Sequence, residues 1–429
     1  MQKLFNKLFA GGKNGGINIS NHGGVVKITG IPGSSGSVIL GAAGNGRVMV
    51  NGVTVIQKNG NIMVTDQNGN TIFQNISAAS IPAVQKKSPS GKDWLSLAIS
   101  ESERDRSVYE PQGKPLHLKK SDVLARGGEG VIYKLAINPN YLVKVCKDET
   151  LKNPRKQAAF CERLTAMLAL EDCRNAGFLS WPQMPVSDSN KNMIGYVMPR
   201  ANGRTLRALY APCQVRRFFP GWDRLQVTKV ALNLVDAVQM LARHRVLVND
   251  FNPDNFLVDK NGSVTLIDCD SFQIPAPYGN TFLTGTFTPE FTAPELLFNA
   301  DLFSVERTPE QVRFSLAVVV YMILMSGLHP YAQCGGSDPA GNLKSGKCPL
   351  DKSSGVRLPV GWYKSVSWLP QTLHDYFVRM FVNGHKHPAE RPLIGELKIE
   401  LENFIEIMRK STNKNQRAIC PENVRRKNK

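Results

Sequence analysis

The sequence is poor in the patterns by which cysteine and histidine bind metal ions. Its eight cysteines are scattered along the chain, without a CxxC pair and without a cysteine–histidine cluster at the spacing of a zinc site. Scattered thiols are typical of proteins from a reducing compartment, and small core or surface residues explain them better than metal ligation does. We therefore expect a cytoplasmic protein that has no thiolate metal centre.

Long hydrophobic runs are also missing. No stretch of about 18 consecutive apolar residues occurs, so the sequence predicts no transmembrane segment. Residues 1–14 are basic, and their apolar part is shorter than the hydrophobic region of a signal peptide. We expect no signal peptide there, and a short surface-binding helix is the alternative for this segment.

Acidic residues are outnumbered. The chain has 53 Lys and Arg against 35 Asp and Glu, which gives a formal net charge of +18. The excess is concentrated in residues 411–429, where Glu422 is the single acidic residue. No aromatic side chain lies among these charges, whereas a surface that stacks nucleic-acid bases needs them. We expect a solvated basic tail that is weakly attracted to acidic partners, and no nucleic-acid site.

The composition changes along the chain in a way that predicts its domains. Residues 15–78 alternate short apolar runs with Gly, Asn and Ser turns, which predicts a small all-β module for interaction or positioning. Its strongest tight-turn signals are Asn51-Gly52, Asn59-Gly60 and Asn68-Gly69. The predicted order is a basic segment at 1–14, the β module at 15–78, a Ser-, Pro- and Lys-rich linker at 79–113, one continuous domain at 114–410 and a basic tail at 411–429.

The large predicted domain mixes strands with helices. Its first part has strand patterns up to about Met198, whereas apolar residues at intervals of three and four predict a helix over Gln226–Arg243. Two short strands are then predicted at Phe256–Val258 and Val264–Ile267. The almost wholly apolar segment Phe314–Met325 predicts a buried helix. The order of these elements predicts an α+β fold.

A glycine-rich segment and a lysine downstream of it have the properties of a phosphate-binding site. Glycines at 127, 128 and 130 would let backbone amides approach phosphate oxygens without a Cβ in the way. Lys144 lies within the apolar run Tyr141–Cys146, where its ammonium is costly to bury unless an anion meets it. The phosphates of ATP would be such a partner, and an edge-strand lysine that faces water is the alternative.

A stronger signal follows the helix predicted at Gln226–Arg243. Phosphoryl transfer needs an acceptor for the proton of the substrate hydroxyl, and it needs hard oxygen ligands for Mg²⁺. Asp250 suits the first task, while Asn255 and Asp268 suit the second. An Asp, an Asn five residues later and a second Asp after a short hairpin have the spacing of kinase catalytic and metal-binding loops.

A third signal lies further along the chain. Residues 288–295, Thr-Pro-Glu-Phe-Thr-Ala-Pro-Glu, strongly resemble the end of the activation segment in serine/threonine kinases. Arg391 lies in a setting like that of the kinase arginine that pairs with the final Glu, here Glu295. Because these motifs occur in the kinase order, residues 114–410 resemble the protein kinase superfamily. The forms GGEG, NDFNPDN and IDCDSF resemble more specifically the bacterial kinases of the tellurite-resistance-associated phosphorylation triads.

The resemblance implies a two-lobed protein-kinase-like fold, ATP and Mg²⁺ (or Mn²⁺) as cofactors, and roles for single residues. The implied cofactor-binding residues are Gly127, Gly128 and Gly130 over the phosphates, Lys144 at the phosphates, Ile132 and Met198 around the adenine, and Pro199, Arg200 and Ala201 in the hinge between lobes. The implied catalytic residues are Asp250, Lys144, its carboxylate partner Glu162 (or Glu171) and Thr288, which would hydrogen-bond Asp250, and the implied metal ligands are Asn255 and Asp268. The triads also imply a PPM-type phosphatase and a von Willebrand factor A protein as partners.

The chain departs from the kinase pattern at several positions. Asn249 replaces the arginine that reads a phosphorylated activation segment, so we expect that a phosphate on Thr284, Thr286 or Thr288 is not the activating switch. Asn252 replaces the lysine that faces the transferring phosphate, which should slow transfer unless another cation substitutes. Further departures are Val248 in place of the histidine before Asn249, Cys269 and Asp270 in place of Phe-Gly, and Val312 in place of a helix-anchoring aspartate.

Three functions are compatible with these residues. The preferred one is an active serine/threonine protein kinase, because the base and metal positions are all filled. A nucleotide-binding pseudokinase or scaffold is the alternative that the loss of lysine at Asn252 favours. A kinase-like enzyme that uses another acceptor, or that transfers a nucleotidyl group, is the third.

Overall fold

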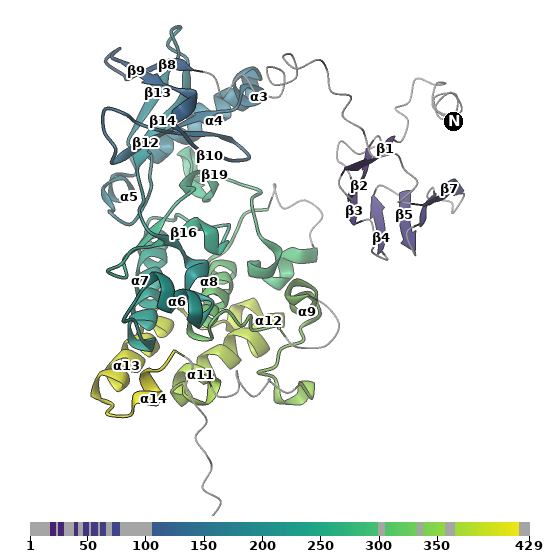
Figure 1. Ribbon diagram of the computed structural model, residues 1–429, viewed down its shortest axis with the longest axis vertical. Helices are drawn as coiled ribbons and strands as arrows, with labels where there is room; N and C mark the ends of the chain where they lie inside the picture. The colour runs from purple at the N-terminus through teal and green to yellow at the C-terminus, as the bar shows by residue number, and fades with distance from the viewer. Residues whose placement is uncertain are drawn as a thin grey trace, which may run out of the picture. The chain divides into compact units, whose positions relative to one another are not determined.

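The fold is given by a computed structural model (Figure 1). It describes residues 105–298, 305–332, 338–356 and 365–419, together with the backbone of seven strands between Asn18 and Ser77. The chain divides into two compact units, Met1–Ala98 and Ile99–Lys429. Within the described ranges, no helix has the length and apolar character that spanning a membrane requires.

The strands of the first unit form two antiparallel sheets, of order β1-β2-β3 and β4-β5-β6-β7. In the second sheet Val50 pairs with Val53 and Lys58 pairs with Asn61. In the sequence, a single Asn-Gly pair therefore connects β4 to β5 and another connects β5 to β6. The strands are Asn18–His22 (β1), Val25–Thr29 (β2), Val38–Gly41 (β3), Gly46–Val50 (β4), Val53–Lys58 (β5), Asn61–Thr65 (β6) and Thr71–Ser77 (β7).

The second unit begins with a curled antiparallel sheet of seven strands, in the order β10-β11-β12-β14-β13-β8-β9. They are Arg106–Tyr109 (β8), Pro115–Leu118 (β9), Val123–Arg126 (β10), Gly130–Lys134 (β11), Tyr141–Cys146 (β12), Met184–Ser187 (β13) and Met193–Pro199 (β14). Strand β8 lies within the predicted linker 79–113, but its Val108 is completely buried in the core of this sheet. A strand of four residues is too short to stand out in the sequence pattern.

Helix α4, Pro154–Ala169, packs on this sheet. Asn153 caps its first turn by accepting two backbone hydrogen bonds, and Pro154 fills the first helical position, where it loses no hydrogen bond. Leu164 packs into an apolar cluster with Tyr196 and Met198 of strand β14. Two short helices, Asp148–Leu151 (α3) and Glu171–Asn175 (α5), flank α4 in the chain.

The rest of this unit is mainly helical (Figure 1). Helix α8 is buried on every side from Val312 to Leu324, and α7 packs against both α8 and α13. The predicted helices at Gln226–Arg243 and Phe314–Met325 are confirmed as α7 and α8. The helices are Pro212–Phe218 (α6), Arg224–Arg243 (α7), Pro309–Leu324 (α8), Pro339–Ser345 (α9), Gln371–Val378 (α11), Gly384–Lys386 (α12), Ile394–Lys410 (α13) and Lys414–Arg417 (α14).

A small sheet of order β15-β16-β17 connects the two parts of this unit. Its strands are Arg204–Thr205 (β15), Phe256–Val258 (β16) and Val264–Leu266 (β17), and a hairpin of Ile274–Pro275 (β18) and Thr281–Phe282 (β19) follows. Gly203 has a φ of 139°, and a Cβ there would lie 2.3 Å from the Val258 carbonyl oxygen, so only glycine fits. Leu266 exchanges backbone hydrogen bonds with the segment 178–180, which leads back to β13.

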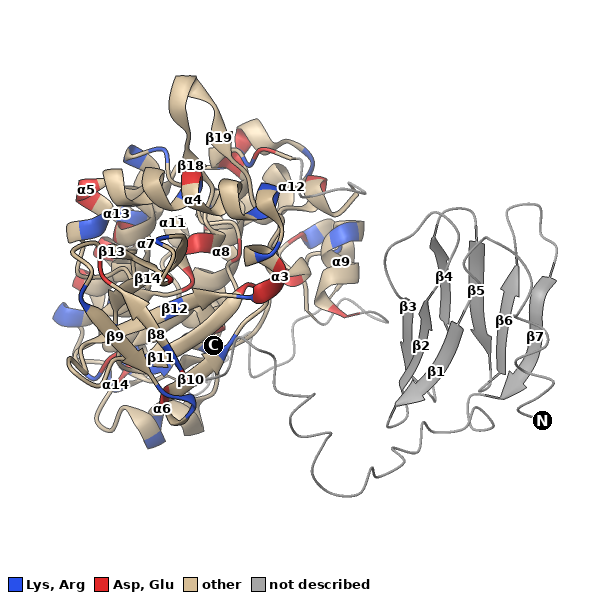
Figure 2. Cartoon of the chain, turned by 90° about the horizontal axis from the view of Figure 1, so that it is seen from above, with Lys and Arg blue, Asp and Glu red and all other residues tan. Residues whose placement is uncertain are grey.

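The second unit is therefore a mixed α+β structure, consistent with the predicted kinase-like fold. In Figure 2, basic and acidic residues are intermixed along the ribbon of this unit. The predicted basic segment 1–14, most of the predicted linker 79–113 and the last ten residues of the predicted tail lie outside the described residues.

Candidate active site

Asp250 lies in the loop between α7 and β16, where neutral hydrogen-bond donors surround it. The hydroxyl of Thr288 donates to Asp250 Oδ1 at 2.7 Å, and Asn255 Nδ2 lies 3.3 Å from Oδ2. The backbone N–H of Asn252 also donates to Oδ1, at 3.2 Å. Asp250 is only 7% exposed, so these donors replace water and fix the orientation of its carboxylate. The contact predicted between Thr288 and Asp250 is present.

Asn255 and Asp268, the predicted metal ligands, lie at the two ends of the β16–β17 hairpin. The backbone N–H of Ile267 donates to the Asn255 carbonyl at 2.9 Å, which keeps these two ends together. Asp268 has a φ of 58°, in the left-handed region that is unfavourable for residues other than glycine. With this backbone, Oδ1 of Asp268 lies 3.2 Å from the ammonium of Lys144.

The Asn255 and Asp268 side chains suit a magnesium ion that is shared with a nucleotide. Carboxylate and amide oxygens are hard ligands, and Mg²⁺ in phosphate sites takes one or two carboxylates together with substrate phosphates. Asn255 directs its Nδ2 at Asp250, which leaves its Oδ1 for a cation. In the part of the chain that the structure describes, no three acidic, His or Cys side chains form a metal cluster, and a site completed by phosphates needs none.

Lys144 is buried in the central strand β12, with 6% of its surface exposed. Its ammonium lies 2.5 Å from Asp270 Oδ2, in addition to its contact with Asp268. Burial alone would lower the pKa of Lys144, but the nearby carboxylates outweigh burial and hold that pKa well above its ordinary value. Lys144 is therefore a permanent cation in the site, and the alternative of an edge-strand lysine facing water is wrong.

Asp270 is a site residue that the sequence reasoning treated only as a replacement for glycine. Burial alone would raise the pKa of Asp270, but Lys144 and Arg163 hold it below its ordinary range. Asp270 is thus a buried carboxylate that stays ionised because cations surround it. The signal that could have found it is a second aspartate two residues after Asp268, because a buried charge next to the first one needs a partner.

The structure does not bring Glu162, the predicted partner of Lys144, into the site. Glu162 is exposed on α4, and both carboxylates that contact Lys144 come from the segment after β17. Glu171, the alternative partner, is also exposed and forms an ion pair within α5. Side chains on a helix rotate by about 100° per residue. The rotation of α4 that turns Arg163 toward the site therefore turns Glu162 to solvent.

The predicted phosphate-binding glycines lie in the turn from β10 to β11. The N–H of Gly127 donates to the Gly130 carbonyl at 2.9 Å, which closes this turn. A Cβ at Gly130 would lie 2.6 Å from the Val145 carbonyl oxygen, so glycine is required there by strand packing. Gly127 and Gly128 have no close neighbour at the Cβ position, which leaves room for phosphate oxygens beside their amides.

Glu129, inside this turn, had no role in the sequence analysis. Burial of its carboxyl group and the negative charge of Asp270 raise the pKa of Glu129 to about 7. Glu129 as a whole is exposed to solvent, so this residue lies at the rim of the cluster formed by Lys144, Asp268 and Asp270. The carboxyl group of Glu129 thus belongs electrostatically to the same site as Lys144.

The residues predicted around the adenine lie at one apolar cluster on the inner strands of the sheet. Met198 is buried in an apolar cluster at the end of β14, and Ile132 packs against the same cluster from β11. Residues 199–201, the predicted hinge, follow directly, and the backbone N–H of Arg200 donates to the Asn140 carbonyl at 2.8 Å. This bond anchors the chain where it leaves the sheet for the helical part.

Thr284 connects the loop of Asp250 to the loop of Asp268. Asn249 Nδ2 donates to the Thr284 hydroxyl oxygen at 2.6 Å, and this hydroxyl donates to the Ser271 carbonyl at 2.6 Å. The Ser271 hydroxyl in turn donates to the Asp268 carbonyl at 2.8 Å. The sequence pointed to Thr284 only as a position whose phosphorylation is not the activating switch, and here its unmodified hydroxyl joins both loops.

A cation lies beside Asn252, where the kinase pattern has a lysine. Arg207 donates from Nε to Asp254 Oδ2 at 2.8 Å, and from a terminal nitrogen to Asn252 Oδ1 at 3.2 Å. It reaches this loop from the chain that follows β15. The structure therefore places positive charge next to the loop that carries Asp250.

The predicted pair of Glu295 and Arg391 is confirmed. Arg391 donates to both carboxylate oxygens of Glu295, at 2.8 and 2.7 Å, and its side chain is completely buried. Its guanidinium also lies over the ring of Phe314, 4.8 Å from the ring centroid. This bidentate pair ties the segment that ends at Glu295 to the start of α13 and to α8.

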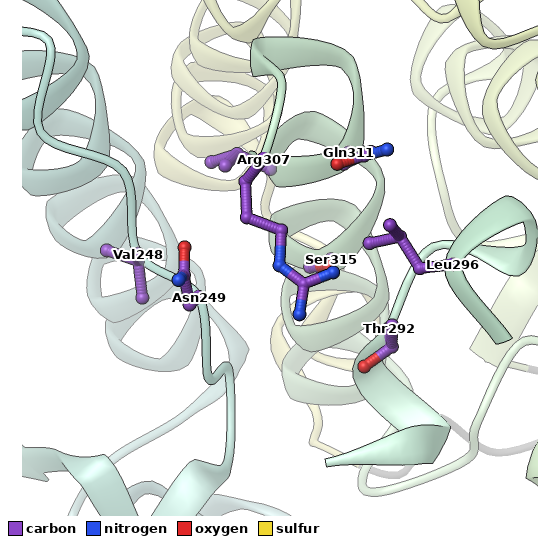
Figure 3. A pocket seen from close by; sticks show the side chains of 8 residues that line it. Val248, Asn249, Thr292, Leu296, Arg307, Gln311 and Ser315 are labelled. Carbon is purple, nitrogen blue, oxygen red and sulfur yellow. The ribbon is translucent and has the colours of Figure 1, made fainter. Parts of the chain in front are cut away.

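A small cavity lies behind the loop that carries Asp250, and Asn249 and Val312 are among its lining residues (Figure 3). Its volume is about 10 Å³, roughly the room for one water molecule. Arg307 extends into it, and none of its three guanidinium nitrogens has a hydrogen-bond partner in the described ranges. Burial lowers the pKa of Arg307, and among the described residues no carboxylate offsets this effect. Val312, which stands where the kinase pattern has an aspartate, lines the same cavity.

Comparison with known proteins supports the same class of protein. No family model matches the chain. It is 31% identical to protein kinase YegI of Escherichia coli strain K12 over 223 residues. These residues cover 51% of this chain and 33% of that protein. It is 26% identical to protein kinase C epsilon type of Oryctolagus cuniculus over 237 residues. These residues cover 54% of this chain and 30% of that protein. Protein kinases are what this chain resembles.

A more distant relative is the rhodopsin kinase of Rattus norvegicus, 23% identical over 204 residues, or 47% of this chain and 34% of that protein. The chain thus spans about a third of the length of the curated relatives it matches. These similarities support a relationship to the protein kinase superfamily. The names of these relatives do not mention the tellurite-resistance triads.

Proposed function

We propose that the chain is a protein kinase that transfers the γ-phosphate of ATP to a serine or threonine hydroxyl, with Mg²⁺ or Mn²⁺ as cofactor. The observation that carries this proposal is the convergence of Asp250, Asn255 and Asp268 with the buried Lys144 in one site. The similarity to protein kinases supports the same reaction class.

The surroundings of each residue fit a step of phosphoryl transfer. Asp250, which Thr288 and Asn255 orient, would hold the substrate hydroxyl and accept its proton. Lys144 would give up one of its carboxylate contacts for an oxygen of the α- or β-phosphate. Asn255 and Asp268 would hold the metal ion, which neutralises charge on the β- and γ-phosphates when it is bound.

Two further features support an active enzyme of this type. Arg207 lies beside Asn252 and would supply the positive charge that the missing lysine gives elsewhere. The hydroxyl of Thr288 bonds the catalytic aspartate, as the resemblance to serine/threonine kinases implies. The resemblance to the triad kinases supports a cytoplasmic location and a PPM-type phosphatase and a von Willebrand factor A protein as partners.

The test is phosphate transfer from γ-labelled ATP to a generic basic protein, with Mg²⁺ or Mn²⁺, followed by mass spectrometry to locate the acceptor residue. We expect labelled serine or threonine with the full chain. Lys144→Ala and Asp268→Ala should lower transfer on the order of 10³-fold or more, because each removes charge stabilisation of the phosphates. Lys398→Ala, which breaks an ion pair with Asp236 on the outer helices, is the matched control and should retain activity.

Full activity of Asp268→Ala would contradict the kinase proposal. A nucleotide-binding pseudokinase is the second candidate, because Arg207 is already engaged by Asp254 and Asn252 carries no charge. Binding of MgATP without turnover would support it. Transfer of label from the α-phosphate to protein would instead indicate nucleotidyl transfer.

A further inference from the structure

Helix α4 reaches the phosphate side of the site through a residue other than the predicted glutamate. The ammonium of Lys144 contacts Asp268 and Asp270, which both lie after β17. The helix therefore contributes no carboxylate to Lys144. What α4 contributes is Arg163, the residue after the predicted Glu162.

Arg163 bridges three backbone carbonyls, two in the segment that carries the carboxylates and one in a later strand. One terminal nitrogen donates to the Asp270 carbonyl at 2.8 Å and also to the Phe272 carbonyl. The other lies 3.4 Å from the Phe282 carbonyl, in strand β19. A guanidinium presents its N–H groups in a rigid planar fork, so it can join acceptors from several strands where an ammonium could not.

The contacts form a continuous connection from the helix to the lysine. Arg163 holds the backbone of Asp270, and the side chain of Asp270 holds Lys144 at 2.5 Å. Lys144 also contacts Asp268, which is a proposed metal ligand. The negative charge of Asp270 faces both cations, and it partly offsets the effect of burial, which lowers the pKa of Arg163. A shift of α4 would therefore move the segment that presents both carboxylates.

We propose that Arg163 is a positioning residue that holds Asp268 and Asp270 in register with Lys144, and that Asp270 replaces a helix glutamate as the carboxylate that orients this lysine. The inference rests on the proposed function, since it concerns the same ATP and metal site. In this arrangement, α4 is connected to the site by hydrogen bonds from Arg163 to backbone carbonyls, and not by an ion pair with Lys144.

Adjacent residues on α4 provide a matched pair of variants. In the full chain, Arg163→Met keeps a long side chain but removes every donor, whereas Glu162→Gln removes the charge of an exposed side chain. We expect Arg163→Met to raise the Mg²⁺ concentration for half-maximal activity about 10-fold and to lower kcat about 10- to 100-fold, as loss of supporting contacts around a metal site typically does. Glu162→Gln should match the wild type in both measurements.

Arg163→Lys and Asp270→Asn complete the set. Arg163→Lys keeps the charge and the stem, so it should fold and recover only part of the activity, because one ammonium cannot reach all three carbonyls. Asp270→Asn should weaken MgATP binding, because it frees Lys144 from its nearest carboxylate. Thermal unfolding of each variant reports stability separately, and the Mg²⁺ requirement is a readout that a merely structural loss would not move.

A wild-type Mg²⁺ requirement in both Arg163 variants would overturn the inference, as would a larger effect of Glu162→Gln than of Arg163→Met. If the wild-type chain binds MgATP but transfers no phosphate, the proposed kinase activity fails. The Mg²⁺ dependence of MgATP binding, measured by calorimetry on the same variants, then decides the inference by itself. A wild-type chain that does not bind MgATP overturns both.

Discussion

The surroundings of Asp250 and of Lys144 meet in one site, but they are held by different forces. Neutral donors orient Asp250: a hydroxyl from Thr288, an amide from Asn255 and a backbone N–H. Lys144 is instead held by two carboxylates, with the carboxyl of Glu129 nearby. The first arrangement is complete without ligands, whereas the second balances charges that incoming phosphates and a metal ion would rearrange. The side proposed to accept the proton is thus preorganised, and the side proposed to bind phosphates is poised to change its contacts.

On the side of Asp250, where neutral donors form the contacts, the stability of the protein should depend on pH through His329. Its Nδ1 accepts from the backbone of Tyr331, so its Nε2 donates to the Glu290 carbonyl beside the Thr288 segment at 2.7 Å. Burial lowers the pKa of His329 from its ordinary 6.5 to about 4. Because the unfolded chain binds the proton more readily, the free energy of unfolding should fall as the pH drops from 6.5 towards 4, by up to about 3 kcal/mol.

Urea unfolding at pH 7.5 and at pH 5 measures this effect. His329→Gln is the control, because it can still donate and accept hydrogen bonds but does not titrate. We expect it to flatten the pH dependence. An unchanged pH dependence in His329→Gln would show that other groups cause the acid sensitivity.

Removing the hydroxyl of Thr288 tests how far the orientation of Asp250 depends on a neutral donor. Thr288→Ala leaves Oδ1 of Asp250 without its closest donor, so we expect kcat to fall about 10- to 100-fold. The KM for ATP should change little, because the phosphate side is held separately. Steady-state kinetics measures both values, and Thr288→Ser should restore most of the rate. A loss confined to KM would contradict the division between the two sides.

Thr284 joins the loop of Asp250 to the loop of Asp268, so loss of its hydroxyl should lower the rate less than loss of the Thr288 hydroxyl does. Thr284→Ala removes the link between Asn249 and the Ser271 carbonyl, and we expect a rate about five- to tenfold lower, roughly the worth of one hydrogen bond. Thr284→Ser should behave like the wild type. The assay uses enzyme stripped of phosphate, and a stripped enzyme that regains activity only when Thr284 is phosphorylated would show that a phosphate, not this hydroxyl, joins the loops.

Replacing Arg307 should have the smallest effect of these changes, and it should alter only the stability of the protein. Its buried guanidinium has no partner in the described ranges, unlike Lys144, whose burial two carboxylates compensate. Arg307→Met fills the same space without a charge, so we expect the free energy of unfolding to rise by about 1 kcal/mol. Arg307→Lys keeps a charge and should give no such gain. A less stable Arg307→Met protein in thermal unfolding would mean that this cation has a partner in solution.

The sequence by itself determined the parts of this protein whose geometry depends on short-range spacing. Asp250 and Asn255 are five residues apart, and Asp268 follows the same short hairpin, so the local backbone alone brings them together. The periodic apolar pattern of α7 and the apolar run of α8 likewise specified those helices. The pairing of Glu295 with Arg391 was predicted from the resemblance to kinase motifs, because no local pattern links two residues 96 positions apart.

Only the tertiary structure decided what surrounds Lys144. Which side chain of α4 meets the segment after β17 depends on the rotation of the helix on the sheet, and a difference of one residue exchanges Glu162 for Arg163. Arg163 and Asp270 are 107 residues apart in the chain, and no local pattern encodes such a contact. The same holds for Thr284 between its two loops and for the uncompensated Arg307 beside Asn249. These contacts form where elements that are distant in the chain pack together. The sequence pattern predicts each element separately, but it does not predict how two elements are positioned against each other.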